Sequence, residues 1–227
     1  MDRGEPESSR VIKVESRATT PVAGAIAGML FAVMFGISVA IISMTMTDVA
    51  DESGAWLERD ADRFKFALAL LPFAGMFFLW FIAVARERLG RFEDQFFTTV
   101  FLGSGLLFLA LMFAAAASAG AIVATYARDP SGFVDSTTYL YARQTVAQIF
   151  GVYALRMAAV FLISQATLWL RTGVMPRWMA FVTYPVALVL LFIVTEVTWI
   201  MLVFPGWVLL ISIYILVVSL RRRGEAA

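Results

Sequence analysis

Long runs of apolar residues, separated by short polar or charged stretches, dominate the chain. Four runs have clear limits, and we place them at Pro21–Met46, Phe66–Val84, Phe97–Tyr126 and Thr145–Leu170. A helix of about 20 apolar residues is long enough to cross the hydrocarbon core of a bilayer. The pattern therefore predicts an all-α fold built from membrane-spanning helices.

The last apolar stretch has no polar loop that would divide it. It holds roughly 43 residues, which suffice for two spans, and we predict these at Trp178–Trp199 and Phe204–Leu220. Pro205 and Gly206 mark the turn, because Pro is favoured at the start of a helix and Gly permits a tight turn. A short re-entrant segment is the alternative. The total is six spans.

Composition agrees with a polytopic membrane protein. Of the 227 residues, 61% are apolar, and the mean hydropathy is +0.82, whereas soluble domains are closer to half apolar. The spans leave no connection long enough for a second domain. We predict a polar disordered tail over residues 1–20, a six-helix transmembrane domain over 21–220 and a basic tail over 221–227.

The distribution of Lys and Arg predicts the orientation. The two tails and the loops after the second and fourth spans carry twelve of these residues, against five in the alternate loops. Basic loops stay on the cytoplasmic side during insertion, so we expect both termini in the cytoplasm, with the plasma membrane of a bacterium as the location. Arg221, Arg222 and Arg223 anchor this orientation and offer a contact for anionic lipids.

The chain contains no Cys and no His. This excludes most transition-metal, haem and iron–sulfur sites, as well as thiol nucleophiles and imidazole bases. We therefore expect no cofactor, no metal and no assignable catalytic residue. The formal net charge of +1 gives no basis for binding nucleic acid.

Two charged residues lie inside the predicted spans, Arg156 in the fourth and Glu196 in the fifth. A guanidinium at the centre of a bilayer costs at least about 2.5 to 3.5 kcal/mol, so Arg156 is expected to face the bundle interior and a partner. The pair has two interpretations: a structural ion pair, or an anion site in which Glu196 changes protonation. Gln165 is a third polar candidate and could also satisfy Arg156.

Small residues recur every four positions along the first span, at Gly24, Gly28, Ala32 and Gly36. Such a ridge lets another helix approach closely. The neighbour could belong to the same chain, to a second copy or to another membrane protein. A run of Ala, Ser and Gly from Ala114 to Ala121 suggests that the third span is the central helix.

Three functions are compatible with these features. The leading hypothesis is a non-catalytic accessory or scaffold protein of the membrane. The second is a small transporter or channel for an anionic or proton-coupled solute, in which Arg156 binds charge and Glu196 acts as the gate. The third is an intramembrane enzyme, and it is the poorest because Glu196 would carry out acid–base chemistry alone.

Overall fold

The computed structural model describes residues 7–46, 54, 56–89, 95–192 and 198–224. Every element in this part of the chain is a helix, which confirms the all-α class. In chain order the elements are α1 (Glu7–Met46), α2 (Trp56–Arg59), α3 (Ala61–Leu89), α4 (Gln95–Tyr126), α5 (Pro130–Val134), α6 (Thr137–Gln148), the π-helix η2 (Ile149–Ala154), α7 (Leu155–Thr172), α8 (Arg177–Phe192), the 3₁₀ helix η3 (Thr198–Leu202) and α9 (Val203–Gly224).

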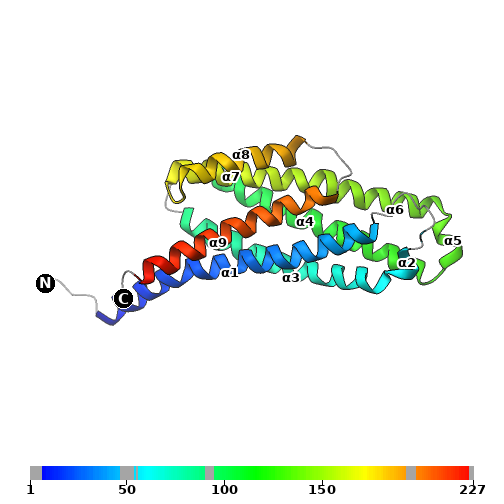
Figure 1. The fold of residues 1–227 in the computed structure, drawn as a ribbon, viewed down its shortest axis with the longest axis horizontal. Helices are drawn as coiled ribbons and strands as arrows, with labels where there is room; N and C mark the ends of the chain where they lie inside the picture. Colours follow the sequence, from blue (N-terminus) through cyan, green and yellow to red (C-terminus); the bar gives the residue numbers. More distant parts are fainter. Residues whose placement is uncertain (1–6, 47–53, 55, 90–94, 193–197, 225–227) are drawn as a thin grey trace.

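The long helices form one elongated bundle and alternate in direction along the chain (Figure 1). Helices α6, η2 and α7 follow one another without interruption from Thr137 to Thr172. Helix α1 packs against α3 and α9, while α7 packs against α4 and α8. The start of α1 and the end of α9 lie at one end of the bundle, which we call the terminal end; α2 and α5 lie at the opposite end, together with the start of α6 (Figure 1).

Five helices are long and apolar enough to cross a membrane. They cover Val22–Thr45, Ala61–Glu87, Phe96–Tyr126, Thr137–Thr172 and Ile200–Arg221. Helix α8 has 16 residues, a length of about 24 Å, which is less than the roughly 30 Å of a hydrocarbon core. The multi-pass architecture agrees with the sequence analysis, but a count of six full spans is not confirmed.

The middle of the chain's last apolar stretch differs from the expectation. Helix α8 ends at Phe192, before the predicted end of the fifth span at Trp199, and residues 193–197 lie outside the described part. Pro205 and Gly206 lie inside α9, which begins at Val203, so they do not form the predicted turn. Pro is tolerated there because the first backbone N–H groups of a helix have no partner within the helix.

Helix α1 begins at Glu7, within the segment for which the sequence predicted a disordered tail. Side chains are described from Val22 onward in this helix. The division of the chain at residues 20 and 221 stays a prediction.

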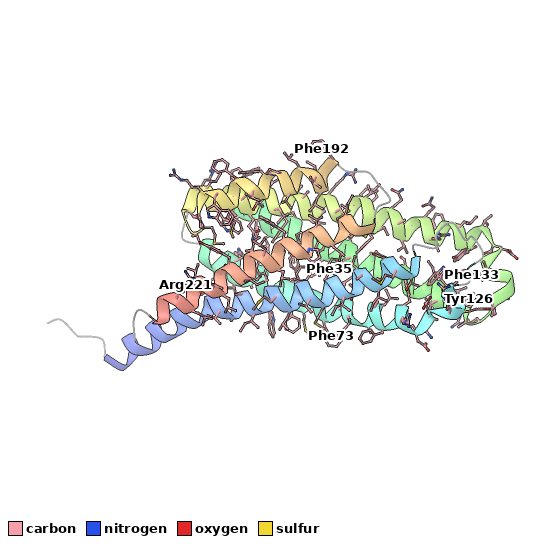
Figure 2. All side chains as sticks on the ribbon, in the orientation of Figure 1. Phe35, Phe73, Tyr126, Phe133, Phe192 and Arg221 are labelled. Carbon is pink, nitrogen blue, oxygen red and sulfur yellow. The ribbon has the colours of Figure 1, made fainter. Side chains whose placement is uncertain are left out.

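Apolar side chains cover the outside of the bundle. On α1, the exposed residues Ile26, Leu30, Val33 and Ile37 form one stripe at helical spacing. Figure 2 shows Phe73 of α3 and Phe192 of α8 pointing outward on opposite sides. Water-soluble monomers rarely expose contiguous apolar patches above a few hundred Å². An apolar belt on several helices is the surface that contact with lipid requires.

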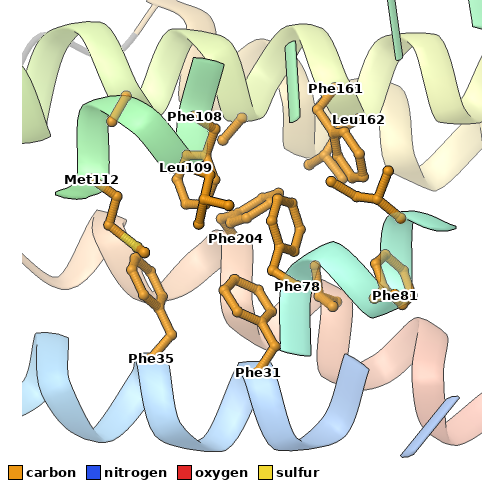
Figure 3. Packing of buried hydrophobic residues seen from close by; sticks show 14 of the residues in the cluster. Phe31, Phe35, Phe78, Phe81, Phe108, Leu109, Met112, Phe161, Leu162 and Phe204 are labelled. Atoms are coloured by element: carbon orange, nitrogen blue, oxygen red, sulfur yellow. The ribbon is translucent and has the colours of Figure 1, made fainter. Parts of the chain in front are cut away.

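Phenylalanine rings from several helices meet at the centre of the bundle (Figure 3). We call this group the aromatic core, and it consists of Phe31 (α1), Phe78 (α3), Phe108 (α4), Phe161 (α7) and Phe204 (α9). The ring centroids of Phe108 and Phe204 are 4.8 Å apart, those of Phe31 and Phe78 4.6 Å, and those of Phe78 and Phe161 5.4 Å. Tilted and edge-on rings at these separations attract one another.

The small-residue ridge of α1 packs within the chain. A Cβ atom at Gly24 would lie 2.5 Å from Val84 of α3, and one at Gly28 would overlap Ser212 Oγ of α9 and lie 2.8 Å from Phe81. Ala32 is also buried, but a Cβ at Gly36 would meet nothing within 4 Å. The sequence did not show whether the ridge contacts the same chain, a second copy or another protein. In the structure, Gly24 and Gly28 pack against helices of the same chain.

Helix α4, the third span, contacts α3, α5, α6, η2 and α7, and its run of small residues is only partly buried. In that run Ala115 and Ala119 are buried, whereas Ala114, Ala117 and Ala121 are exposed. Helix α4 has 32 residues, about 48 Å, so it extends beyond a hydrocarbon core. Ile122 and Val123, near its end, pack in a separate apolar cluster with Tyr139 of α6.

We expect Phe204→Ala to lower the free energy of unfolding by somewhat less than the about 3 to 5 kcal/mol typical of Phe→Ala in soluble cores. Lipid offers nearly the same apolar surroundings as the core, so the loss is mainly ring packing. Denaturation in mixed detergent micelles measures it. Phe73→Ala is the matched control, since Phe73 is 53% exposed, and equal effects of the two changes would contradict the role of the aromatic core.

A second matched pair tests the ridge. We expect Gly28→Ala to destabilise the protein by about 1 to 3 kcal/mol, because the added methyl group overlaps Ser212 and Phe81. Gly36→Ala should be neutral or stabilising by up to about 1 kcal/mol, because its Cβ enters open space and Ala is the better helix former. The same denaturation assay serves, and loss of stability in both variants would argue against intrachain packing of the ridge.

Candidate functional site: polar groups inside the bundle

Arg156 lies in the first turn of α7, directly after the π-helix η2, and is partly buried. Its Nη1 donates a hydrogen bond of 2.9 Å to the carbonyl oxygen of Val152, which belongs to η2. Side chains on a helix lean toward its N-terminus. The guanidinium therefore reaches back along its own helix, toward the end of the bundle that carries α5.

The structure also changes the depth assigned to Arg156. The helix that holds it begins at Thr137, eight residues before the predicted start of the span. Fifteen residues separate Arg156 from Arg171, a rise of about 22 Å. With Arg171 at one boundary of a roughly 30 Å core, Arg156 lies about midway between the centre and the opposite boundary. A long Arg side chain can extend its charged head toward water from there.

Glu196 lies outside the described residues. Its predicted pairing with Arg156 therefore stays a prediction, as does any role of the pair as an anion site or a gate.

Gln165 lies within α7 and is 2% exposed. Within the described part of the chain, its Oε1 atom is buried and has no hydrogen-bond partner. Nine residues separate it from Arg156, which corresponds to about 13 Å along the axis and to opposite faces of the helix. The structure does not bring the two together, so Gln165 does not satisfy Arg156 as the sequence suggested.

Gln165 lines a cavity of about 40 Å³. The walls come from α1, α3, α7, α9 and the loop after α7, and they are almost entirely apolar: Gly24, Ala25, Phe81, Val84, Ala85, Trp169, Val174, Met175 and Ile215. Val174 is exposed in the loop that follows α7, so the cavity reaches the terminal end of the bundle.

Ser212 is a polar group that sequence reasoning missed. It is fully buried on α9, and its Oγ has no hydrogen-bond partner among the described residues. A lone Ser in an apolar run gives no signal, since its importance comes from its position opposite Gly28. Only the packing of α9 on α1 brings these two residues together.

The opposite end of the bundle is stabilised by its own contacts. Trp56 Nε1 donates to Tyr139 Oη at 3.1 Å across the buried gap between α2 and α6. Nearby, Asp60 forms ion pairs with Arg59 at 2.8 Å and Arg63 at 3.3 Å. Figure 2 shows Phe133 and Tyr126 at this end. We call this end, formed by α2, α5 and α6 with the adjoining ends of α3 and α4, the cap.

Among the residues that the structure describes, no three or more His, Cys, Asp or Glu side chains lie together in a group that could hold a metal ion. At the terminal end, Arg221 is exposed at the end of α9 (Figure 2). The side chains of Arg222 and Arg223 lie outside the described part, and lipid binding by the three stays a prediction.

We expect Arg156→Leu to leave the free energy of unfolding unchanged or to raise it. The hydrogen bond to Val152 lies within one helix, while Arg in a span is less favourable than Leu by about 2.5 to 3.5 kcal/mol or more. Unfolding in lipid–detergent micelles measures this, with Glu196→Gln and the double variant completing a cycle. A loss of stability in Arg156→Leu that Glu196→Gln restores would instead show an ion pair.

No protein-family model, no curated protein and no solved structure matches this chain. Its function must be argued from its own geometry. The five long apolar helices and the apolar belt fit a multi-pass integral membrane protein in contact with a lipid bilayer.

Proposed function

We propose that the chain is a non-catalytic accessory or scaffold protein of a bacterial plasma membrane, with both termini in the cytoplasm. The aromatic core is the observation that carries this proposal. Rings from five helices fill the centre of the bundle, where a carrier or channel would need polar groups, backbone carbonyls or a discontinuous helix to bind solute.

The buried hydroxyl groups strengthen the argument. The side chains of Ser38, Ser43, Ser104, Ser164 and Thr183 each donate to the carbonyl oxygen four residues earlier in their own helix. Hydroxyl groups bonded in this way are not available to line a path for solute. Within the described spans, these five hydroxyl groups thus form hydrogen bonds only with the backbone of their own helix.

The cap supplies what a scaffold needs outside the bilayer. Helix α4 and the continuous helix α6–η2–α7 are longer than a hydrocarbon core is thick, and the buried Trp56–Tyr139 hydrogen bond holds α6 against α2. Tyr141 of α6 is 75% exposed on the surface of this region. An ordered surface that stands out of the membrane can hold another protein without any catalytic group.

A transporter or channel for an anionic or proton-coupled solute is the second candidate. One observation favours it: Arg156 follows the π-helix η2, and single π-turns within α-helices often occur at functional sites. In this alternative Arg156 binds the charge and Glu196 is the gate. An intramembrane enzyme has no comparable support.

Flux measurements separate the two candidates. We expect purified protein in liposomes loaded with a pH-sensitive dye to dissipate imposed proton and chloride gradients no faster than protein-free liposomes, because the aromatic core leaves no polar path. Arg156→Leu and Glu196→Gln should then behave like the parent. Flux above the protein-free control that Arg156→Leu abolishes would establish the transporter instead.

The scaffold proposal also predicts an assembly. Native mass spectrometry of the protein, extracted in mild detergent from the membranes of its own cell, should show a complex heavier than one 25.1-kDa chain and containing a different protein. A single chain alone under these conditions would contradict the proposal.

A further inference from the structure

Arg156 is only partly buried, and it uses a single N–H group of its guanidinium inside the protein. Nη1 donates to the carbonyl oxygen of Val152, and the described part of the chain gives this side chain no other hydrogen bond and no ion pair. Two buried side-chain atoms among the described residues lack a partner, and neither belongs to Arg156. Its remaining N–H groups therefore reach the surface of the bundle.

The surface that these N–H groups reach lies near the boundary of the hydrocarbon core on the side of the cap. Arg156 is about 22 Å from Arg171 along α7, which leaves about 8 Å to the far boundary of a roughly 30 Å core. The side chain leans toward the N-terminus of its helix, which is the direction of the cap. A long Arg side chain covers most of that remaining distance, so the guanidinium lies where the headgroups begin.

The described part of α8 leaves this position uncovered. Helix α8 packs against α7, and a 2.9 Å hydrogen bond between Thr167 Oγ1 and Tyr184 Oη aligns the two antiparallel helices. From that bond, Phe192 at the end of α8 is 8 residues away (184 to 192), or about 12 Å, whereas Arg156 is 11 residues away (167 to 156), or about 16 Å. Helix α8 thus ends no farther toward the cap than Arg156, and the guanidinium points past it.

Tyr153 places a second donor on the cap side of Arg156. It belongs to η2, precedes Arg156 by three residues in the sequence and is 57% exposed. Tyr is enriched at the boundary between hydrocarbon and headgroups, where its ring contacts apolar groups and its hydroxyl contacts polar ones. Neither side chain bonds to another side chain in the part of the molecule that is described. A cationic donor and a neutral donor at this depth call for an anionic acceptor.

We propose that Arg156 binds the phosphate group of a phospholipid in the leaflet on the cap side, and that Tyr153 donates to the same headgroup. The planar guanidinium forms paired hydrogen bonds with phosphate oxygens, and these charge-assisted bonds are stronger than neutral ones. The bound headgroup holds the bundle at a depth that leaves the cap outside the bilayer. This site does not depend on the scaffold role, and its ligand is a membrane lipid and not a transported solute.

Lipid titration followed by native mass spectrometry tests the site. Delipidated protein in detergent is titrated with dioleoylphosphatidylglycerol, and the fraction of protein that carries lipid gives an apparent Kd for the tightest site. Dioleoylglycerol, which has the same acyl chains and no phosphate, is the control ligand. We expect Arg156→Leu to weaken phosphatidylglycerol binding at least about fivefold, the effect of losing one charge-assisted hydrogen bond, and to leave dioleoylglycerol binding unchanged.

Arg128→Leu is the matched control variant, because Arg128 is an exposed Arg that follows the end of α4 in the cap. It should bind phosphatidylglycerol as the parent does. Equal affinity of Arg156→Leu and the parent for phosphatidylglycerol would overturn the proposal, and so would equal affinity of the parent for the two lipids. Displacement of the bound lipid by free inorganic phosphate would show an anion site for a solute instead.

Photo-crosslinking of the parent keeps the proposal testable should Arg156→Leu fail to fold. A phosphatidylglycerol analogue with a diazirine next to one acyl ester labels residues just inside its headgroup. With equimolar lipid, the label should appear on the exposed residues Tyr153 and Phe192, near the level of Arg156. Labelling confined to Trp178 and Leu220, which are exposed apolar residues near the terminal end, would overturn the proposal.

Discussion

The meeting of aromatic rings at the bundle centre is the interaction on which the rest of this structure depends. Between helices surrounded by lipid, apolar burial provides little driving force, because a lipid tail is as apolar as a Leu side chain. Specific van der Waals packing must take its place. Phe204 contacts the rings of Phe31, Phe78, Phe108 and Phe161, so a single side chain of α9 links four other helices. The close approach of α1 at Gly24 and Gly28 lets those rings meet.

The same constraint explains the treatment of polar groups. Without water, each buried hydroxyl needs a local acceptor, and bonding to the preceding turn supplies one at little structural cost. Hydrogen bonds between helices are fewer; Thr167 with Tyr184 (2.9 Å) and Trp207 with Thr183 (3.2 Å) connect the short α8 to its neighbours. Against this background, Gln165 and Ser212 are exceptions, because within the described residues the Oε1 of Gln165 and the Oγ of Ser212 are buried without a hydrogen-bond partner.

Much of the architecture could be predicted from the sequence. In lipid every backbone N–H and C=O group needs a hydrogen-bond partner within the protein, so a long apolar run that crosses the membrane forms a helix. The ridge at Gly24 and Gly28 was also visible as a helix contact. The sequence did not show which of the 20 Phe residues meet in the aromatic core, because a Phe that faces lipid and a Phe that faces the core lie in equally apolar sequence. The cavity was hidden for a related reason: Gln165 was recognised as polar, but the other walls come from α1, α3 and α9, which only the tertiary structure brings together. The short α8 was missed because Trp178–Leu220 has no polar loop to mark where the helix ends.

The uninterrupted helix from Thr137 to Thr172 runs from the cap into the bundle and so connects the two rigidly. Its π-turn at Ile149–Ala154 holds one more residue than an α-turn does, so every position beyond it is offset by about 100° from an unbroken α-helix. Tyr139 on one side of that offset and Phe161 on the other each have a fixed partner. The π-turn therefore determines how the side chains of α6 in the cap are rotated about the helix axis relative to those of α7 in the bundle. Inserting or deleting one residue in this π-turn would rotate the side chains of α6 by about 100° relative to those of α7. The contacts of Tyr139 and of Phe161 could then not form together, although neither residue would have changed.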